Sequence, residues 1–242
     1  LGLDSFHEYY LRLRDHTQRK LEIERALESL TTNETYFFRE LPQLRAFAMD
    51  VLPELHTLHR TRRSLTVWSA GCSTGEEVYT LAILIRESGL FADWNVRVFG
   101  NDISRRVLNV ARRGVYRDPS FRALPPEYAR YFVSTSEGRA VVPEVREMSC
   151  FGHFSLFDES RVAMLGPVDV IFCRNVLIYL DAASRGRLIQ LFYERLTPGG
   201  YLMLGHSESL LHTPTAFELA HLHNDLAYRK PLRPDAERRR PV

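Results

Sequence analysis

The sequence predicts an α/β protein built on a doubly wound parallel sheet. Three observations lead to this prediction. From residue 65 onward, apolar strands alternate with amphipathic helices. The first strand runs into a glycine turn, Gly71 to Gly75, and a helix follows it directly. The residues before this strand contain helical periodicity only. Apolar strands joined by amphipathic helices form a parallel sheet that is covered on both faces.

The N-terminal region, residues 1–60, is expected to be a short and truncated helical domain with its linker. Its apolar residues recur at the spacing of an amphipathic helix. Three helices are predicted, over residues 5–14, over residues 23–30 and from Pro42 onward. Asp4 or Ser5 caps the first helix, and Pro53 bends or restarts the third.

Residues 61–230 are expected to form the sheet domain, with residues 231–242 as a polar tail or linker. Strands are predicted at residues 65–69, 96–102, 151–154, 168–175, 201–205 and 226–230. Helices are predicted over residues 75–88, after Ser104 and after Asp181. The alternation breaks at residues 115–150, where a short helix over 126–132 and a hairpin turning at 136–138 indicate an inserted β-subdomain.

Composition restricts the function classes. The formal net charge is only +2, so no global field favours nucleic acid as a partner. The three cysteines are widely spaced, which fits a reducing compartment better than a disulfide framework or a zinc site. We find neither a signal peptide nor an apolar run of about 18 residues, so we expect a cytoplasmic protein without membrane insertion. A start at Leu1 and a polar end suggest a segment of a longer protein.

The glycine turn in WSAGCSTGEEVY, residues 68–79, restricts the ligand. It lacks the lysine of a phosphate-binding loop, and the carboxylates of Glu76 and Glu77 would repel a pyrophosphate. The next strand ends in Asp102, about where an acid receives ribose hydroxyls. An adenosine with a cationic substituent and no phosphate meets both demands, which favours S-adenosylmethionine (SAM). In the alternative interpretation, the glutamates only complement a helix dipole and Asp102 only caps the next helix.

Five segments of the sequence stand out as motifs, in the order TTNETYFFRE, WSAGCSTGEEVY, FGNDIS, FCRNVLIYLD and GGYLMLGHSESL. Together they resemble the CheR family of chemotaxis-receptor methyltransferases. The resemblance spans about residues 5–230 and implies transfer of a methyl group from SAM to receptor glutamates, forming γ-methyl esters. It also implies an N-terminal helical domain and a SAM-binding, Rossmann-like doubly wound domain with a small inserted β-subdomain.

The resemblance assigns roles to particular positions. The residues that it implies for cofactor binding are Asn33, Thr35, Arg39, Gly71, Glu77, Asp102, Ser155, Leu156, Arg174 and Asn175. Arg39 is expected near the methionine carboxylate, which a guanidinium binds in a bidentate manner. Arg39 and Tyr179 are the expected catalytic residues, with Tyr179 reaching toward the methyl group. The family usually has Asn-Leu where this chain has Ser155-Leu156, so the adenine contact there is expected to be weaker or made by the backbone.

A glutamate nucleophile is already ionised at neutral pH, so its methylation requires no general base. We therefore expect His206 to be structural, SAM and its product S-adenosylhomocysteine (SAH) to be the ligands, and no metal to take part. Two alternatives stay open. One is a SAM methyltransferase that acts on an amine of nucleic acid or of a small molecule, although Arg174-Asn175 stands where such enzymes commonly carry [ND]PP[YF]. The other is a sensor that binds SAM or SAH without turnover.

The expected partner is the cytoplasmic helical region of a chemotaxis receptor, with a receptor tail peptide at the β-subdomain as a further expectation. An arginine-rich face of the N-terminal helices would dock on acidic receptor helices. That face consists of Arg12, Arg14, Arg19 and Lys20. Most such charge runs are only solvated surfaces. The family's N-terminal domain is also longer and carries a basic helix that docks on the receptor, and only its latter part is expected in this sequence.

Overall fold

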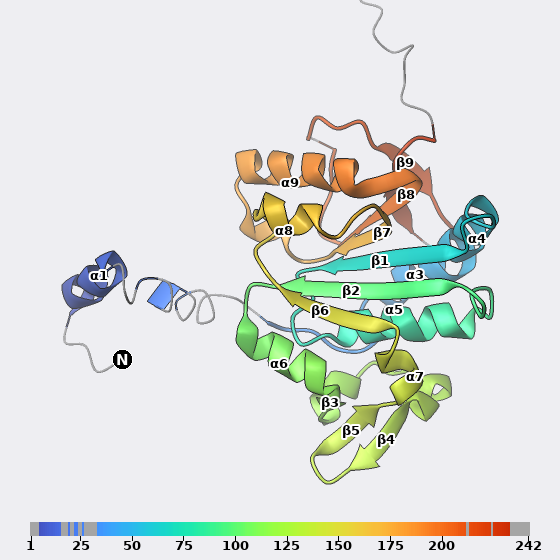
Figure 1. Ribbon diagram of the computed structural model, residues 1–242, viewed down its shortest axis with the longest axis horizontal. Coiled ribbons are helices and arrows are strands. Elements are labelled where there is room, and N and C mark those ends of the chain that lie inside the picture. The colour runs from blue at the N-terminus through green and yellow to red at the C-terminus, as the bar shows by residue number, and fades with distance from the viewer. Residues whose placement is uncertain are drawn as a thin grey trace, which may run out of the picture.

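We describe the fold from a computed structural model (Figure 1). The structure describes residues 5–15, 19, 22, 23, 26, 33–211, 213–223 and 225–232. Three of the predicted features lie wholly or partly outside these residues: most of the second helix, Lys20 of the arginine-rich face, and most of the polar tail. Within the described part of the chain, no helix is long and apolar enough to cross a membrane.

The N-terminal helices follow the sequence signals closely. Helix α1, Phe6–Arg14, begins where the Ser5 hydroxyl accepts a hydrogen bond from the Glu8 amide. Helix α3, Leu41–Ala46, continues through a π-helical turn, η1 (Phe47–Val51), into α4 (Leu52–Leu58). Pro53 has no amide hydrogen to donate, and the wider π turn precedes it. The predicted restart at Pro53 is therefore confirmed.

The central sheet has the strand order β6–β2–β1–β7–β8–β10–β9. Its strands are β1 (Ser64–Ala70), β2 (Asn95–Asp102), β6 (Ser149–His153), β7 (Val168–Cys173), β8 (Leu196–Leu204), β9 (Glu218–His221) and β10 (Leu226–Arg229). The chain builds outward from β1 through β2 to β6, then returns to add β7 and β8 on the other side. The order therefore reverses between β1 and β7, and a crevice is expected outside the carboxyl ends of these two strands.

Helices cover both faces of the sheet, as predicted for a doubly wound fold. They are α5 (Glu76–Glu87), α6 (Arg105–Arg113), α8 (Glu159–Ala163) and α9 (Ala182–Arg195). Val67 and Phe172 pack with residues of α3, α4 and α5 in one core. Trp68, Ile171 and Leu202 face the opposite way and pack with α9 in a second core. Successive strand residues point to opposite faces, so this sheet needs apolar residues at consecutive positions.

Three details of the predicted sheet were wrong. The sheet is not wholly parallel, because β10 runs antiparallel to β8 and pairs with a further strand, β9, which was not predicted. Strand β8 begins at Leu196 and not after Gly200, since Leu196 already pairs with Val168. An irregularity in register between Val168 and Val170 accommodates the extra residues, so the Pro-Gly-Gly sequence lies inside the strand.

Between α6 and β6 the chain forms a separate three-stranded antiparallel sheet, which we call the insert (Figure 1). Its elements are β3 (Val115–Tyr116), η2 (Asp118–Phe121), η3 (Pro126–Tyr131), β4 (Phe132–Thr135), β5 (Gly138–Val141) and α7 (Pro143–Arg146). Pairing of β4 with β5 confirms the predicted hairpin. The short helix is present as the 3-10 helix η3.

Aromatic side chains fasten the insert to the N-terminal segment. Phe37 is fully buried and stacks on Phe121 with ring centroids 5.1 Å apart. Tyr116 and Phe132 form edge-to-face pairs with the same ring, with centroids 4.9 and 4.7 Å apart. The Phe37 amide also donates a hydrogen bond to the Ser120 carbonyl. The segment that precedes α3 therefore contributes to the core of the insert.

Candidate functional site

The candidate site lies at the carboxyl ends of β1 and β7, where the strand order reverses, and we call this edge of the sheet the crevice. The turn after β1 has left-handed backbone at Gly71, Ser73 and Gly75. A Cβ atom on Gly71 would lie 2.8 Å from the Val176 Cγ2 atom, so glycine lets the turn approach the loop that follows β7. The turn is held to β2, because the amides of Gly71 and Cys72 both donate to the Asn101 carbonyl.

The two glutamates after the turn have different surroundings. The Glu77 carboxylate accepts hydrogen bonds from the Ser69 hydroxyl at 2.7 Å and from Arg174 Nε at 2.6 Å. Glu76 is buried and accepts from the hydroxyls of Thr74 and Ser120, the second of which belongs to the insert. Burial raises the pKa of the Glu76 carboxyl. Glu77 therefore belongs to the crevice, whereas Glu76 joins the turn to the insert.

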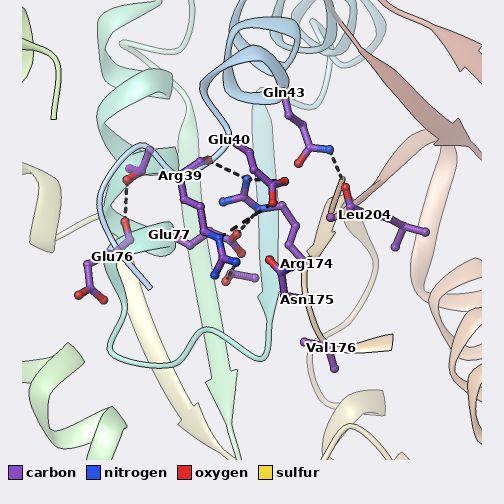
Figure 2. A network of polar contacts seen from close by, with 12 residues as sticks. Arg39, Glu40, Gln43, Glu76, Glu77, Arg174, Asn175, Val176 and Leu204 are labelled. Carbon is purple, nitrogen blue, oxygen red and sulfur yellow. Dashed lines mark hydrogen bonds and ion pairs between the residues drawn. The ribbon is translucent and has the colours of Figure 1, made fainter. Parts of the chain in front are cut away.

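The Arg174 guanidinium connects three segments at the crevice (Figure 2). Its side chain is only 4% exposed and forms an ion pair with Glu77 from α5. Arg174 Nη1 also donates to the Arg39 carbonyl at 2.9 Å and lies 3.5 Å from a Glu40 carboxylate oxygen. One buried cation therefore orders β7, α5 and the turn of residues 37–40 around the same point.

The turn of residues 37–40 is strained. Phe38 and Glu40 adopt positive φ angles of 60° and 58°, which residues other than glycine rarely do. The Phe38 amide donates to the Thr80 hydroxyl, and the Phe38 ring stacks on Tyr128 of the insert. Arg39, between them, has a side chain that is 26% exposed, and its Nη1 donates to the Glu34 carbonyl. The strained turn thus presents Arg39 to the crevice while both neighbours are fixed.

Asp102, at the end of β2, ties the glycine turn to the start of α6. One carboxylate oxygen accepts from the Ser73 amide and the other from the Ser104 amide, each at 2.9 Å. Burial raises the pKa of the Asp102 carboxyl, although these amides oppose the shift. The cap of α6 itself is the Ser104 hydroxyl, which accepts from the Val107 amide. Asp102 therefore fixes the turn more than it caps the helix.

The loop after β7 begins with a left-handed residue, Asn175, whose φ angle is 58°. It continues into the 3-10 helix η4 (Leu177–Tyr179). The Tyr179 side chain is 61% exposed. After β6, Ser155 is exposed and its hydroxyl accepts from the Phe157 amide, whereas Leu156 is buried. Both segments lie at the same edge of the sheet as the glycine turn, because β6 and β7 run parallel to β2 and β1.

Comparison with known proteins identifies the family. The family model described as "CheR methyltransferase, SAM binding domain" matches residues 33–225. The chain is 34% identical to "Chemotaxis protein methyltransferase 2" of Vibrio cholerae over 230 residues, and this matched region covers 94% of this chain and 79% of that protein. It is 36% identical over 225 residues to "Chemotaxis protein methyltransferase" of Salmonella typhimurium, covering 90% and 75%. The chain belongs to the CheR methyltransferase family. It is therefore a member of a SAM-dependent methyltransferase family.

In this CheR-family protein, most of the predicted site residues meet around the crevice. Arg39, Glu77 and Arg174 lie together in one network (Figure 2). The Asn33 carbonyl accepts from the Ser73 hydroxyl, which links the NET segment to the glycine turn; Thr35 is two residues further along and half-buried. His206 is exposed. Among the described residues, no group of three or more His, Cys, Asp or Glu side chains could hold a metal ion.

Sequence reasoning missed three polar residues that support the site. Gln43 donates to the Leu204 carbonyl and ties α3 to the end of β8 (Figure 2). Asn101 is buried, accepts from Trp68 Nε1 and donates to the Phe154 carbonyl. Glu208 accepts hydrogen bonds from the loop after β7. Asn101 and Glu208 both lie in segments that carry the family resemblance, FGNDIS and GHSES, where attention went to Asp102 and His206 instead, whereas Gln43 carried no signal.

Proposed function

We propose that this CheR-family protein transfers the methyl group of SAM to glutamate side chains of a chemotaxis receptor, forming γ-methyl esters. The observation that carries the proposal is the crevice network of Glu77, Arg174 and Arg39 beside a glycine turn without a lysine. This network offers both anionic and cationic side chains, which a zwitterionic ligand requires. The two relatives named above are chemotaxis protein methyltransferases by name, which supports a receptor substrate.

Residues of the crevice fit SAM on their own chemistry. Arg39 is partly exposed and has N–H groups left after its bond to the Glu34 carbonyl, so it would bind the methionine carboxylate. Glu77 has one hydrogen bond at each oxygen and keeps lone pairs for the ligand's ammonium group. Asp102 likewise keeps lone pairs for ribose hydroxyls.

The remaining predicted residues would shape the pocket. Gly71 would let the turn lie against the ligand, and the buried Leu156 would supply an apolar wall for adenine beside Ser155. Asn33 and Thr35 would close over the ligand with Arg39. Arg174 and Asn175 hold the floor of the crevice at the end of β7.

SAM supplies an electrophilic methyl group on its sulfonium. The chain then has to align a carboxylate with that methyl group and exclude water. The substrate glutamate has an ordinary pKa of about 4.3 and needs no proton removed at neutral pH. Tyr179 is exposed in the helix that follows the β7 loop and would orient the incoming carboxylate, which makes Tyr179 and Arg39 the proposed catalytic residues.

The proposed partner is the helical cytoplasmic region of a receptor, and the proposed location is therefore the cytoplasm. Arg12 and Arg14, in the last turn of α1, would contribute to docking on acidic receptor helices. A receptor tail peptide is the proposed ligand of the insert. Because exposed charges act over about 8 Å at physiological ionic strength, docking should weaken with salt.

The test is methyl transfer from tritiated SAM to receptor-containing membranes, scored as base-labile counts. A receptor whose methylatable glutamates are changed to alanine is the control. Base-labile counts on the first receptor and none on the second support the proposal. Base-stable counts would mean an amine methyltransferase. SAH binding by calorimetry without any transfer would mean a sensor.

A further inference from the structure

A single carboxylate, that of Glu208, holds the loop that follows β7. Its Oε2 atom accepts from the amides of Asn175 at 2.8 Å and Gly205 at 2.9 Å. Its Oε1 atom accepts from Val176 at 2.9 Å, Leu177 at 2.7 Å and, more weakly, Ile178 at 3.4 Å. A carboxylate has about four lone-pair sites, so this one is fully used by backbone amides. Four consecutive amides of the loop converge on it.

The convergence requires an unusual backbone. Asn175 adopts a φ angle of 58°, which turns the chain sharply after β7 and aims the following amides at one point. The convergence also favours glycine at position 205, for a steric reason. A Cβ atom there would lie 2.8 Å from Glu208 Oε2 and 3.0 Å from the Asn175 amide nitrogen. Strands β7 and β8 are adjacent, so the carboxylate joins their two ends.

Resting on the proposed function, we propose that Glu208 is a positioning residue for methyl transfer. The segment that it holds contains Asn175 and leads to Tyr179, the residues proposed to line the crevice and to orient the substrate carboxylate. Glu208 acts through these residues and not by contact with the reacting atoms. Its charge-assisted hydrogen bonds fix the segment before substrate arrives.

The charge is essential to this role. Glutamine at position 208 has the same size but offers one acceptor oxygen and an NH₂ group, which would face amide donors. Aspartate keeps both oxygens on a shorter side chain, so it can restore part of the set. The Glu208→Gln and Glu208→Asp variants therefore separate charge and acceptor number from volume. Glu218→Gln, at an exposed position of the edge strand β9, is the matched control.

The experiment combines hydrogen–deuterium exchange, SAH calorimetry and methyl-transfer kinetics on the intact protein. In Glu208→Gln, the amides of residues 176–178 should exchange at least about tenfold faster while β1 is unchanged. The kcat should fall about 100-fold, as a displacement of about 1 Å commonly causes. SAH affinity should change less, because Arg39, Glu77 and Asp102 are untouched. Glu208→Asp should recover part of the kcat, and Glu218→Gln should match the wild type.

Gly205→Ala provides a second route, because its methyl group displaces the carboxylate while leaving the charge in place. It should reproduce the faster exchange and the lower kcat, and it decides the matter if Glu208→Gln does not fold. A wild-type kcat in folded Glu208→Gln or Gly205→Ala, with only a lower melting temperature, overturns the proposal. If the wild type transfers no methyl group to receptor, the proposed function fails. In that case hydrogen–deuterium exchange and SAH calorimetry alone test the role of Glu208. Unchanged exchange at residues 176–178 then overturns that role.

Discussion

Two acid–arginine pairs lie at opposite edges of the same sheet, and each has a largely buried carboxylate. At the carboxyl edge, Glu77 pairs with Arg174. At the amino edge, Asp169 pairs with Arg62, accepts from the Thr66 amide and the Thr197 hydroxyl, and lies 3.2 Å from His59 Nε2. The chemistry of the two pairs is similar, but their settings differ.

The partners of Asp169 belong mainly to regular elements or adjoin them: β1, β8 and the end of α4. The partners of Glu77 lie next to strained turns. Four of the five described non-glycine residues with positive φ, namely Phe38, Glu40, Ser73 and Asn175, lie near the carboxyl edge, and the fifth, Arg63, follows Arg62 at the amino edge. Backbone strain concentrated around a buried ion pair is typical of a ligand site, whereas a buried acid bound mainly by regular elements fastens a fold.

The largest effect is expected at the carboxyl edge. Arg174→Met leaves the largely buried Glu77 carboxylate unpaired and should lower the free energy of unfolding by about 3–5 kcal/mol. Adding Glu77→Gln removes the orphan charge and should restore most of that stability, without restoring SAH affinity. Urea unfolding and calorimetry on the single and double variants measure the two quantities. Wild-type SAH affinity in the double variant would assign the pair to stability alone.

Arg39→Ala should weaken SAH binding by about 1.5–3 kcal/mol, since a charged hydrogen-bonding partner of the ligand is lost. That corresponds to roughly 10- to 150-fold in Kd. Stability should change little, because the partly exposed guanidinium makes one hydrogen bond to a carbonyl and a long ion pair of 4.0 Å with Glu40. Arg45→Ala, an exposed arginine in α3, is the control. Equal SAH affinity in both variants would remove Arg39 from the site.

Asp169→Asn should lower the free energy of unfolding by about 1–3 kcal/mol, because one buried amide or hydroxyl donor loses its acceptor. SAH affinity should equal that of the wild type. Loss of SAH affinity at unchanged stability would reverse the contrast between the two edges.

A smaller effect concerns pH at the amino edge. Burial lowers the pKa of His59 below its ordinary 6.5, despite the attraction of Asp169. Below pH 6.5, His59 therefore binds a proton in the unfolded chain but not in the folded chain. The free energy of unfolding that neutral His59 contributes at higher pH is consequently lost as the pH falls from 6.5 toward the lowered pKa. The His59→Gln variant lacks this term. The difference in unfolding free energy between wild type and variant should shrink from pH 7.5 to pH 5.5, and a constant difference would contradict the prediction.

The smallest expected effect is none at all. With an ionised glutamate as nucleophile, the transfer rate on saturating receptor should be nearly flat between about pH 6 and 8.5. His206→Ala should leave this profile unchanged, since the side chain is exposed. A limb near pH 6.5 that disappears in the variant would make His206 a catalytic base.

Much of the fold follows from local patterns, because apolar periodicity, caps such as Ser104 and breakers such as Pro53 act within a few residues. Strand β9 escaped prediction because it is a short edge strand with mixed polar and apolar residues. The Pro-Gly-Gly sequence of β8 was misplaced because a register irregularity is set by the neighbouring strand.

The site residues could be predicted from motifs that resemble those of the family, but the contacts between these residues could not. No sequence spacing indicates that Glu77 binds Arg174, 97 positions later, or that Glu76 turns to Ser120 of the insert. Adjacent glutamates on a helix point in different directions, so their partners depend on the packing of the whole domain. Glu208 is similar, because its role appears only where β7 and β8 end side by side.

The position of Phe37 has a consequence for modularity. Its ring completes an aromatic core whose other members, Tyr116, Phe121 and Phe132, all belong to the insert. A peptide of residues 115–150 alone would lack that ring and expose the others to water. We therefore expect the inserted segment to need Phe37 for its stability, which a melting temperature lowered in Phe37→Ala would support. A chimera that receives an insert from another chain has to match a phenylalanine that lies outside the grafted boundaries.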